Sequence, residues 1–448
     1  MTEFQIGLTL AVFGAVILAI AFDVIDMAAA ALLGVSVLLM AEVLDSTDVM
    51  AAIEAGSGPL LLLAGGMIVA QTLASTGIFD RVSTVYLRAT RGSGKRFLLL
   101  LIVLVAPLCA LLPNATTVVL LAPVIVRVAK ALDIDIVKPL IVTAIVSNSA
   151  GLLTLVGDPA TFIVGHAIGM SFGEYMKRVS LGGLLSIATV AALMPILLRD
   201  IWTVQREMPK PPQPQPLDRP GFAIVSVALL FGMIVLFVFG EDLPGRIVPP
   251  ETAFIAGSVA LLAIGAVRVS TVDQVIRDLD WRTLIFLCCT FCLVQAVTNT
   301  GLLQSLSLQL YEWFGNHLKV VSMNLLAGVG LLSSVLANTP VVAASITMVK
   351  GYLVAAEIVP DAALGTGFHA WPLATLPVFV AMMFAGTLGG NATLIGAAAN
   401  LAAIGVGVRN GAKVTFLTWL RYGIPITIAQ MFVSALYVFV LFALVGRS

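Results

Sequence analysis

Long apolar runs alternate with short polar segments along almost the whole chain. A helix needs about 20 mostly apolar residues to cross a bilayer, and ten runs approach that length. These runs cover residues 5–22, 27–44, 59–76, 140–156, 179–198, 221–240, 252–267, 283–299, 371–390 and 422–445. The pattern predicts an all-α polytopic membrane protein, because a helix bonds all of its own backbone polar groups within the lipid.

Two further apolar runs, residues 97–130 and 319–356, carry polar residues at their centres. The first is interrupted at Asn114 and the second at Asn338. We expect each run to form two half-length helices that meet at a polar tip. Such a re-entrant hairpin enters and leaves the membrane on the same side. The alternative is an ordinary pair of kinked spans.

The two halves of the chain carry the same polar pattern. Asn114 and Asn338 lie 224 positions apart, and a polar, proline-rich segment at 204–220, typical of an extended linker, separates the halves. Each half, 1–203 and 221–448, holds five spans and one hairpin. Because five is odd, the second half starts on the opposite side of the membrane, so we predict inverted repeats. The 224-residue offset also relates Gln71 to Gln295, Thr76 to Thr300 and Gly77 to Gly301.

The span that follows each hairpin contains a glycine-rich interruption. We expect broken helices over 140–170 and 371–406, since both contain the motif Thr-Leu-(Val/Ile)-Gly. Glycine lets a helix unwind, and a following proline ends it. Unwound backbone at the midplane is tolerated beside a polar cavity, where it binds an ion or a polar solute. The alternative is that the glycines only allow tight helix packing. The backbone positions singled out are Gly151, Gly157, Gly390 and Gly396.

Composition and charge place the protein in a membrane. Of the 448 residues, 60% are hydrophobic and 11% charged, which is more apolar surface than a soluble protein hides. Basic and acidic residues number 24 each and give no reason to expect nucleic acid. With the N-terminus outside, 18 of the 24 Lys and Arg residues fall inside. We therefore expect a multi-pass protein of the cell (inner) membrane, with both termini outside and the linker 204–220 in the cytoplasm. The segments 78–92 and 301–316 are expected as amphipathic surface helices, one on each side.

The sequence predicts no cofactor and no metal site. The histidines share no metal-ligand spacing, and neither a GxxxxGK phosphate loop nor a nucleophile–base pair is apparent, so we expect no enzyme. The cysteines all lie in apolar segments and are typical of buried thiols, although three of them could also attract a thiol-seeking metalloid. The cysteines are Cys109, Cys288, Cys289 and Cys292.

Amide and hydroxyl side chains at the hairpin tips and helix breaks are the candidate substrate ligands. Polar groups at membrane depth are costly unless they have partners or a function. Asp158 is the one acid expected near the bilayer centre, and we assign it proton or ion coupling. An Asp-Pro pair also suits a helix N-cap, and the two roles are compatible. The candidate ligands are Asn114, Thr117, Asn148, Thr154, Asn338, Thr339, Asn391 and Thr393.

These motifs resemble the ion transporter superfamily. The stretches 114–127, 147–159 and 389–396 carry the resemblance, which is greatest to the branch of ArsB arsenite permeases, NhaD sodium/proton antiporters and the melanosomal P protein. Sodium-coupled carboxylate transporters of the superfamily have Ser-Asn-Thr at both tips, whereas here the tips read Pro-Asn-Ala and Ala-Asn-Thr. The resemblance implies a mobile transport part and a scaffold, built from the first two spans of each half, that dimerises in many relatives.

We therefore predict a secondary active transporter that exports arsenite or antimonite by alternating access with proton coupling. Arsenite at neutral pH is mainly an uncharged trihydroxide, which amides, hydroxyls and backbone dipoles bind without a countercharge. The alternatives are a sodium/proton antiporter, a sodium-coupled transporter of a small anion such as a dicarboxylate, and a channel. The sequence leaves open whether the chain forms a homodimer and whether a cytoplasmic ATPase subunit docks on it.

Overall fold

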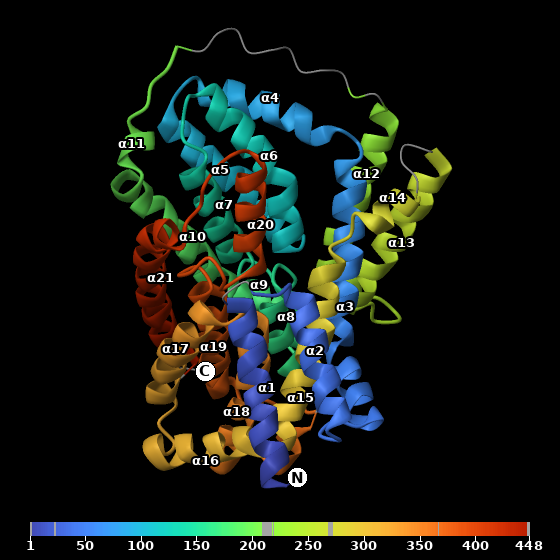
Figure 1. The fold of residues 1–448 in the computed structure, drawn as a ribbon, viewed down its shortest axis with the longest axis vertical. Helices are drawn as coiled ribbons and strands as arrows, with labels where there is room; N and C mark the ends of the chain where they lie inside the picture. Colours follow the sequence, from blue (N-terminus) through green and yellow to red (C-terminus); the bar gives the residue numbers. More distant parts are fainter. Residues whose placement is uncertain are drawn as a thin grey trace.

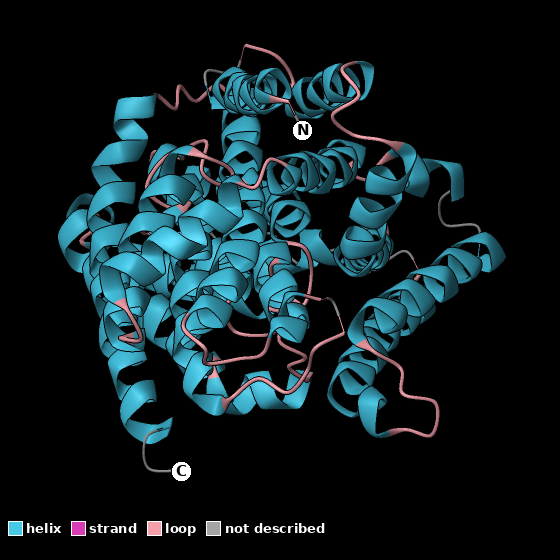
Figure 2. Ribbon diagram, turned by 90° about the horizontal axis from the view of Figure 1, so that it is seen from below, coloured by secondary structure: helices cyan, strands magenta, loops and turns pink. Residues whose placement is uncertain are grey.

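The chain folds into helices joined by short connections (Figures 1 and 2). The computed structural model describes residues 2–21, 24–207, 217, 219–267, 272–365 and 367–445. Among these residues, extended backbone pairs only in an isolated bridge between Ser93 and Gln205. Most of the proline-rich linker lies outside the described residues, as do three of the basic residues counted for the orientation, Lys210, Arg268 and Arg447.

The helices divide into two series in chain order. The first series is α1 (Glu3–Ala21), α2 (Met27–Met40), α3 (Ser46–Ala74), α4 (Ile78–Thr90), α5 (Gly94–Cys109), α6 (Asn114–Ala131), α7 (Val137–Ala150), α8 (Pro159–Ala167), α9 (Phe172–Arg178), α10 (Ser180–Leu197) and α11 (Arg199–Trp202). The second is α12 (Pro220–Phe239), α13 (Pro249–Val267), α14 (Val272–Arg277), α15 (Trp281–Asn299), α16 (Leu302–Phe314), α17 (Leu318–Val335), α18 (Asn338–Ala355), α19 (Leu376–Gly389), α20 (Ala398–Arg409) and α21 (Phe416–Val445). Short 3₁₀ turns lie at Gly240–Asp242, Asp361–Leu364 and Leu373–Thr375.

The class predicted from the sequence, an all-α protein with several membrane spans, is confirmed. Within the described residues, nine helices are long and apolar enough to cross a membrane. The helix expected over 27–44 is shorter than predicted, since α2 ends at Met40. A turn follows, and a capping box starts α3: the Asp45 carboxylate accepts a hydrogen bond from the Asp48 amide (2.8 Å), and the Asp48 carboxylate accepts one from the Asp45 amide (3.1 Å).

Both centrally interrupted runs form two helices. α5 ends at Cys109 and α6 begins at Asn114, while α17 ends at Val335 and α18 begins at Asn338. Pro113 and Ala337 precede the new helices with similar extended backbone, at φ −54°, ψ 129° and φ −57°, ψ 136°. Figure 1 shows α5 and α6 in the upper half of the molecule, and α17 and α18 in the lower half.

The helices pack into two groups that meet around the interrupted segments. In one group α3 packs against α13 and α15; in the other α17 packs against α19, and α20 packs against α6 and α7. α3 and α13 approach so closely that a Cβ on Gly65 would overlap the Ala253 carbonyl. Small residues allow this approach between membrane helices.

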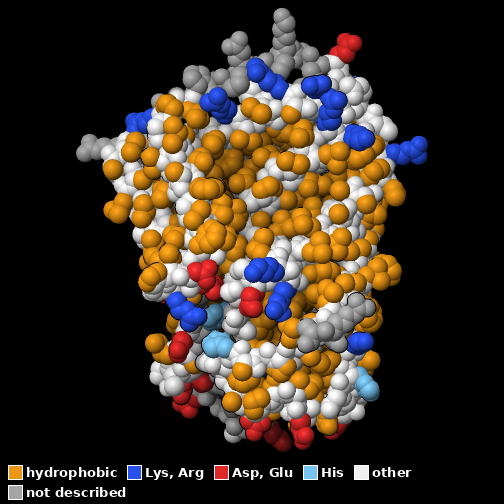
Figure 3. All heavy atoms as spheres, turned by 180° about the vertical axis from the view of Figure 1, so that it is seen from behind, with side chains coloured by type: hydrophobic (Ala, Val, Ile, Leu, Met, Phe, Trp, Pro, Cys, Tyr) orange, Lys and Arg blue, Asp and Glu red, His pale blue; other side chains and the backbone are white. Residues whose placement is uncertain are grey.

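The two amphipathic segments form helices at opposite ends of the molecule. α4 lies across the long axis at the top of Figure 1, and α16 lies across it at the bottom. Each follows a glycine with left-handed backbone, Gly77 (φ 73°) and Gly301 (φ 76°), a conformation that glycine adopts without a steric penalty. Figure 3 shows Lys and Arg side chains along the rim at the α4 end and an apolar band below them. A cluster of basic and acidic side chains follows below this band, and Asp and Glu side chains lie at the other end.

Candidate functional site

Four helices begin at one cavity near the centre of the molecule. The first residues of α6, α8, α18 and α20 line this cavity. Two of these helices follow the interrupted hairpins, and the other two follow the glycine-rich breaks. The amide groups at a helix start have no partner within their own helix, so these ends direct partial positive charge toward the cavity.

Five of the side chains expected from the sequence line this cavity. They are Asn114, Asn148, Asp158, Asn338 and Thr339. Asp158 is the one ionisable side chain among the described residues of the lining.

The two tip asparagines hold the hairpins against the breaks that follow them. With its amide oriented as a donor, Asn114 Nδ2 lies 3.2 Å from the Gly157 carbonyl and 3.3 Å from the Cys109 carbonyl. In the other half, the backbone amide of Asn338 donates to the Gly396 carbonyl (3.3 Å). Each tip is therefore bonded to the last glycine of the neighbouring break, which places both asparagines beside the cavity.

Asp158 joins the two halves of the chain. Its side chain is buried, and its carboxylate accepts a hydrogen bond from Thr387 Oγ1 on α19 (3.1 Å). Its backbone has the extended conformation of an N-cap residue (φ −140°, ψ 136°), but its side chain makes no capping hydrogen bond to α8. The equivalent position in the second half is Ala397, so the carboxylate makes the site asymmetric.

A network of buried amides lies directly behind the cavity. Asn148 Nδ2 donates to Asn391 Oδ1 (2.9 Å) and to Asn400 Oδ1 (3.0 Å), and Asn391 Nδ2 donates to Gln430 Oε1 (2.9 Å). Gln430 Nε2 in turn donates to Ser149 Oγ (2.8 Å). Asn391 contributes to this network and is not part of the cavity lining.

Sequence reasoning missed three functional candidates in these contacts: Thr387, Asn400 and Gln430. Gln430 had a usable signal, because it is a single amide in the long apolar helix α21, and such a group needs partners in lipid.

The threonines of the two breaks have matching partners. Thr154 Oγ1 donates to the Ala110 carbonyl, and Thr393 Oγ1 donates to the Ser334 carbonyl. Each acceptor lies four residues before a tip asparagine. Both threonines are absent from the cavity lining, as is the buried Thr117. In this conformation Thr154 and Thr393 connect each hairpin by a hydrogen bond to the glycine-rich break that follows it.

The four predicted glycines form two close pairs. A Cβ on Gly157 would lie 2.9 Å from both Cα and O of Gly151, and a Cβ on Gly396 would lie 2.6 Å from O of Gly390. Any side chain would meet backbone, which cannot rotate away. The pairs therefore let each interrupted helix fold back on itself at the cavity.

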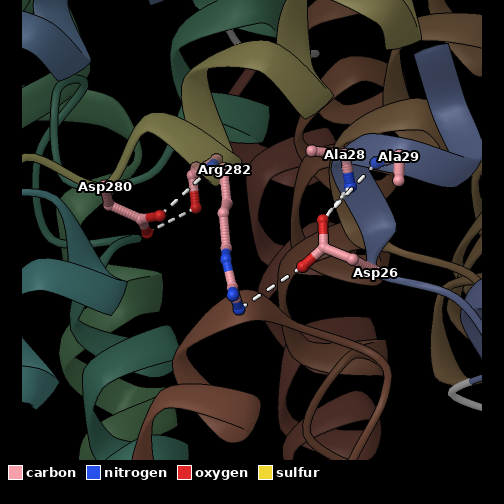
Figure 4. Close-up of polar contacts among 6 residues, drawn as sticks. Asp26, Ala28, Ala29, Asp280 and Arg282 are labelled. Carbon is pink, nitrogen blue, oxygen red and sulfur yellow. Dashed lines mark hydrogen bonds and ion pairs between the residues drawn. The ribbon is translucent and has the colours of Figure 1, made fainter.

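An exposed ion pair lies next to the cavity wall (Figure 4). Arg282 Nη1 is 3.3 Å from Asp26 Oδ2, while Asp26 Oδ1 caps α2 by accepting from the amides of Ala28 (3.0 Å) and Ala29 (3.4 Å). The next residues along the chain, Met27 and Thr283, line the cavity. The Arg282 side chain is 75% exposed, and in this ion pair it neutralises the charge of Asp26 beside the cavity.

All four cysteines are free thiols. Cys109, Cys289 and Cys292 are buried, and Cys288 is partly exposed. Cys109 Sγ donates to Ser147 Oγ (3.1 Å) beside the first tip.

Comparison with known proteins identifies the family. A family model described as Citrate transporter (CitMHS) matches residues 17–374. The chain belongs to this citrate transporter family. It is 38% identical to an uncharacterised transporter of Synechocystis over 96% of both chains, and 28% identical to an uncharacterised transporter of Mycobacterium tuberculosis over 95% of this chain and 96% of the relative.

The resemblance to the P protein is also found, at a lower level. The human P protein is 23% identical over 99% of this chain and 61% of its own length. These matches support a membrane transporter of the citrate transporter family. Membership of the arsenite permease branch stays a prediction.

Proposed function

We propose that this chain is a secondary active transporter that carries a small anion through the central cavity, coupled to a cation that binds at Asp158. The observation that carries the proposal is the meeting of four helix N-termini at one cavity whose lining, among the described residues, holds a single carboxylate.

The helix ends supply the attraction for an anion. Each N-terminus carries about half a positive charge, and exposed backbone amides at a helix start bind carboxylate or phosphate groups readily. The side chains of Asn114, Asn338 and Thr339 add donors to this surface. The site therefore binds an oxygen-rich solute without needing Lys or Arg.

Asp158 supplies the coupling. Its negative charge opposes an anion in the same cavity, and a proton or a sodium ion at the carboxylate removes that opposition. Each of the two ligands then raises the affinity of the other by the same factor. A transporter built in this way carries the anion and the cation together.

The family description points to a carboxylate, and citrate is the first substrate to test. Arsenite or antimonite is the second candidate, favoured by the absence of basic side chains from the described lining, since an uncharged trihydroxide needs no countercharge. In that case the solute is exported against a proton.

We further propose that 1–203 and 221–448 are inverted repeats, and that 97–130 and 319–356 are re-entrant hairpins that enter from opposite sides. Supporting this are the paired tips, the paired glycine contacts and the two threonine–carbonyl bonds, one set from each half. Alternating access would move the hairpins and broken helices against a scaffold of the first two spans of each half, α1, α2, α12 and α13, which pack against α3 and α15. The inner-membrane location, outside termini, homodimer and docked ATPase stay predictions.

The test is transport by purified protein in proteoliposomes. Labelled citrate and labelled arsenite are offered separately, under an imposed sodium gradient or proton gradient. Citrate uptake that requires one of the gradients supports the proposal. Arsenite transport without citrate transport favours the second candidate. Sodium/proton exchange without either solute would overturn both and favour an antiporter.

A further inference from the structure

A second polar groove lies at the end of the molecule that carries α4, away from the central cavity. It is lined by residues of α7, α10, α11 and α21, and α10 contacts the other three helices. α10, α11 and the beginning of α21 lie along the left edge of Figure 1. None of its lining residues lines the central cavity.

The groove carries a net positive charge. Lys138, Arg199 and Arg421 line it together with one acid, Asp200. Lys138 Nζ forms an ion pair with Asp200 and lies 5.9 Å from the centre of the Tyr422 ring, so its position is held from two sides. Among the described residues, neither Arg199 nor Arg421 forms an ion pair, and both side chains are exposed. Two guanidinium groups are therefore available for an anion.

One side of the groove is apolar and continues into the outer surface of the protein. Ile196, which lines it, is 72% exposed. Leu417 and Ile428 lie outside the lining, four residues before and seven after Arg421, so they share its face of α21, and they are 76% and 65% exposed. Exposed side chains of this kind on a membrane helix face lipid tails. A molecule bound here would contact two arginines at one end and an apolar surface at the other.

We propose that this groove binds the headgroup of an anionic phospholipid. Arginine matches phosphate oxygens with a planar, bidentate set of donors, and basic pockets between membrane helices bind phosphate-bearing lipid headgroups. The Thr418 hydroxyl in the lining offers a further donor. The adjoining apolar wall accommodates the acyl chains, and this feature favours a lipid over a free phosphate ion.

Native mass spectrometry of the delipidated, full-length protein tests the proposal. Phosphatidylglycerol, phosphatidylcholine and inorganic phosphate are added separately. We expect phosphatidylglycerol to bind more tightly than phosphatidylcholine, and inorganic phosphate in millimolar excess to leave it bound. In Arg199→Gln/Arg421→Gln, the affinity for phosphatidylglycerol should fall about thirtyfold, because each basic residue near an anionic lipid surface contributes roughly a five- to sixfold factor in affinity.

Two further variants complete the experiment. Lys413→Gln removes an exposed basic residue in the connection before α21, outside the groove, and should bind phosphatidylglycerol like the wild type. Arg199→Lys/Arg421→Lys keeps the charge and should lose less affinity than the glutamine variant. Equal binding of both lipids, unchanged binding by the glutamine variant, or equal loss in the lysine and glutamine variants would overturn the proposal. Displacement of the lipid by inorganic phosphate would instead identify a free-ion site.

Discussion

The carboxylate of Asp158 accepts a hydrogen bond from the hydroxyl of Thr387, 229 residues further along the chain (3.1 Å). Asp158 immediately precedes α8 and Thr387 lies near the end of α19, so the bond joins the broken segments of the two halves beside the cavity. A change in the charge of this carboxylate therefore acts on both halves together, and coupling by Asp158 needs such a connection.

Asp158→Asn should abolish coupling while leaving exchange. The amide has the same shape as the carboxylate but binds no cation. Citrate uptake driven by a gradient should therefore fall at least about tenfold, which corresponds to a loss of about 1.4 kcal/mol or more in coupling free energy. Exchange of internal for external citrate should persist because the helix N-termini remain. Glu54→Gln, an exposed acid on α3, is the control. Full gradient-driven uptake by Asp158→Asn would exclude this carboxylate as the coupling site.

Arg282→Gln should weaken the binding of an anion more than it slows the transport step. Removal of the guanidinium leaves the Asp26 carboxylate without its ion-pair partner beside the cavity. This negative charge repels anions through the solvent, so we expect KM for citrate to rise about three- to tenfold at low salt with little change in kcat. Initial uptake rates at low and high ionic strength measure this effect, which should shrink as salt screens the charge.

Arg282→Lys is the matched control and should keep most of the affinity. Arsenite transport should be insensitive to both changes, since the solute is uncharged. A KM effect of equal size at high salt would contradict this role for Arg282.

Gln430→Leu should destabilise the fold. The change removes the partner of Asn391 Nδ2 and of Ser149 Oγ, both in buried residues, and an unpaired buried polar group costs about 1–3 kcal/mol. Thermal unfolding of purified protein in detergent should show a clearly lower midpoint. Asn324→Leu is the control, because Asn324 is exposed and its amide donates only to the Val320 carbonyl of its own helix. An equal shift in both variants would mean that the buried network adds no stability.

Gly157→Ala should disturb the first break. The added Cβ would lie 2.9 Å from the backbone of Gly151, and overpacking of this kind costs about 1–3 kcal/mol. We expect a lower unfolding midpoint and a loss of transport in the same variant. Gly232→Ala on α12, where a Cβ would meet nothing within 4 Å, should behave like the wild type. Normal transport by Gly157→Ala would show that the close glycine pair is not needed.

The sequence by itself determined where the helices are interrupted. Apolar run length marks the spans, and the polar residues within a run mark the interruptions at Asn114 and Asn338, because lipid does not tolerate unpaired polar groups. The recurrence of the same pattern in each half also singled out the four glycines that form close pairs in the structure.

Only the tertiary structure decided which polar groups face the cavity. In α7 nearly every residue is buried, and in α19 all are, so these helices have no polar face from which an orientation could be read. Asn148 and Asp158 line the cavity, while Asn391 bonds into the network behind it and Thr154 bonds to a hairpin carbonyl. Their sequence contexts are alike. The difference arises because each side chain's partners come from helices far away in the chain, and local sequence does not determine how those helices pack.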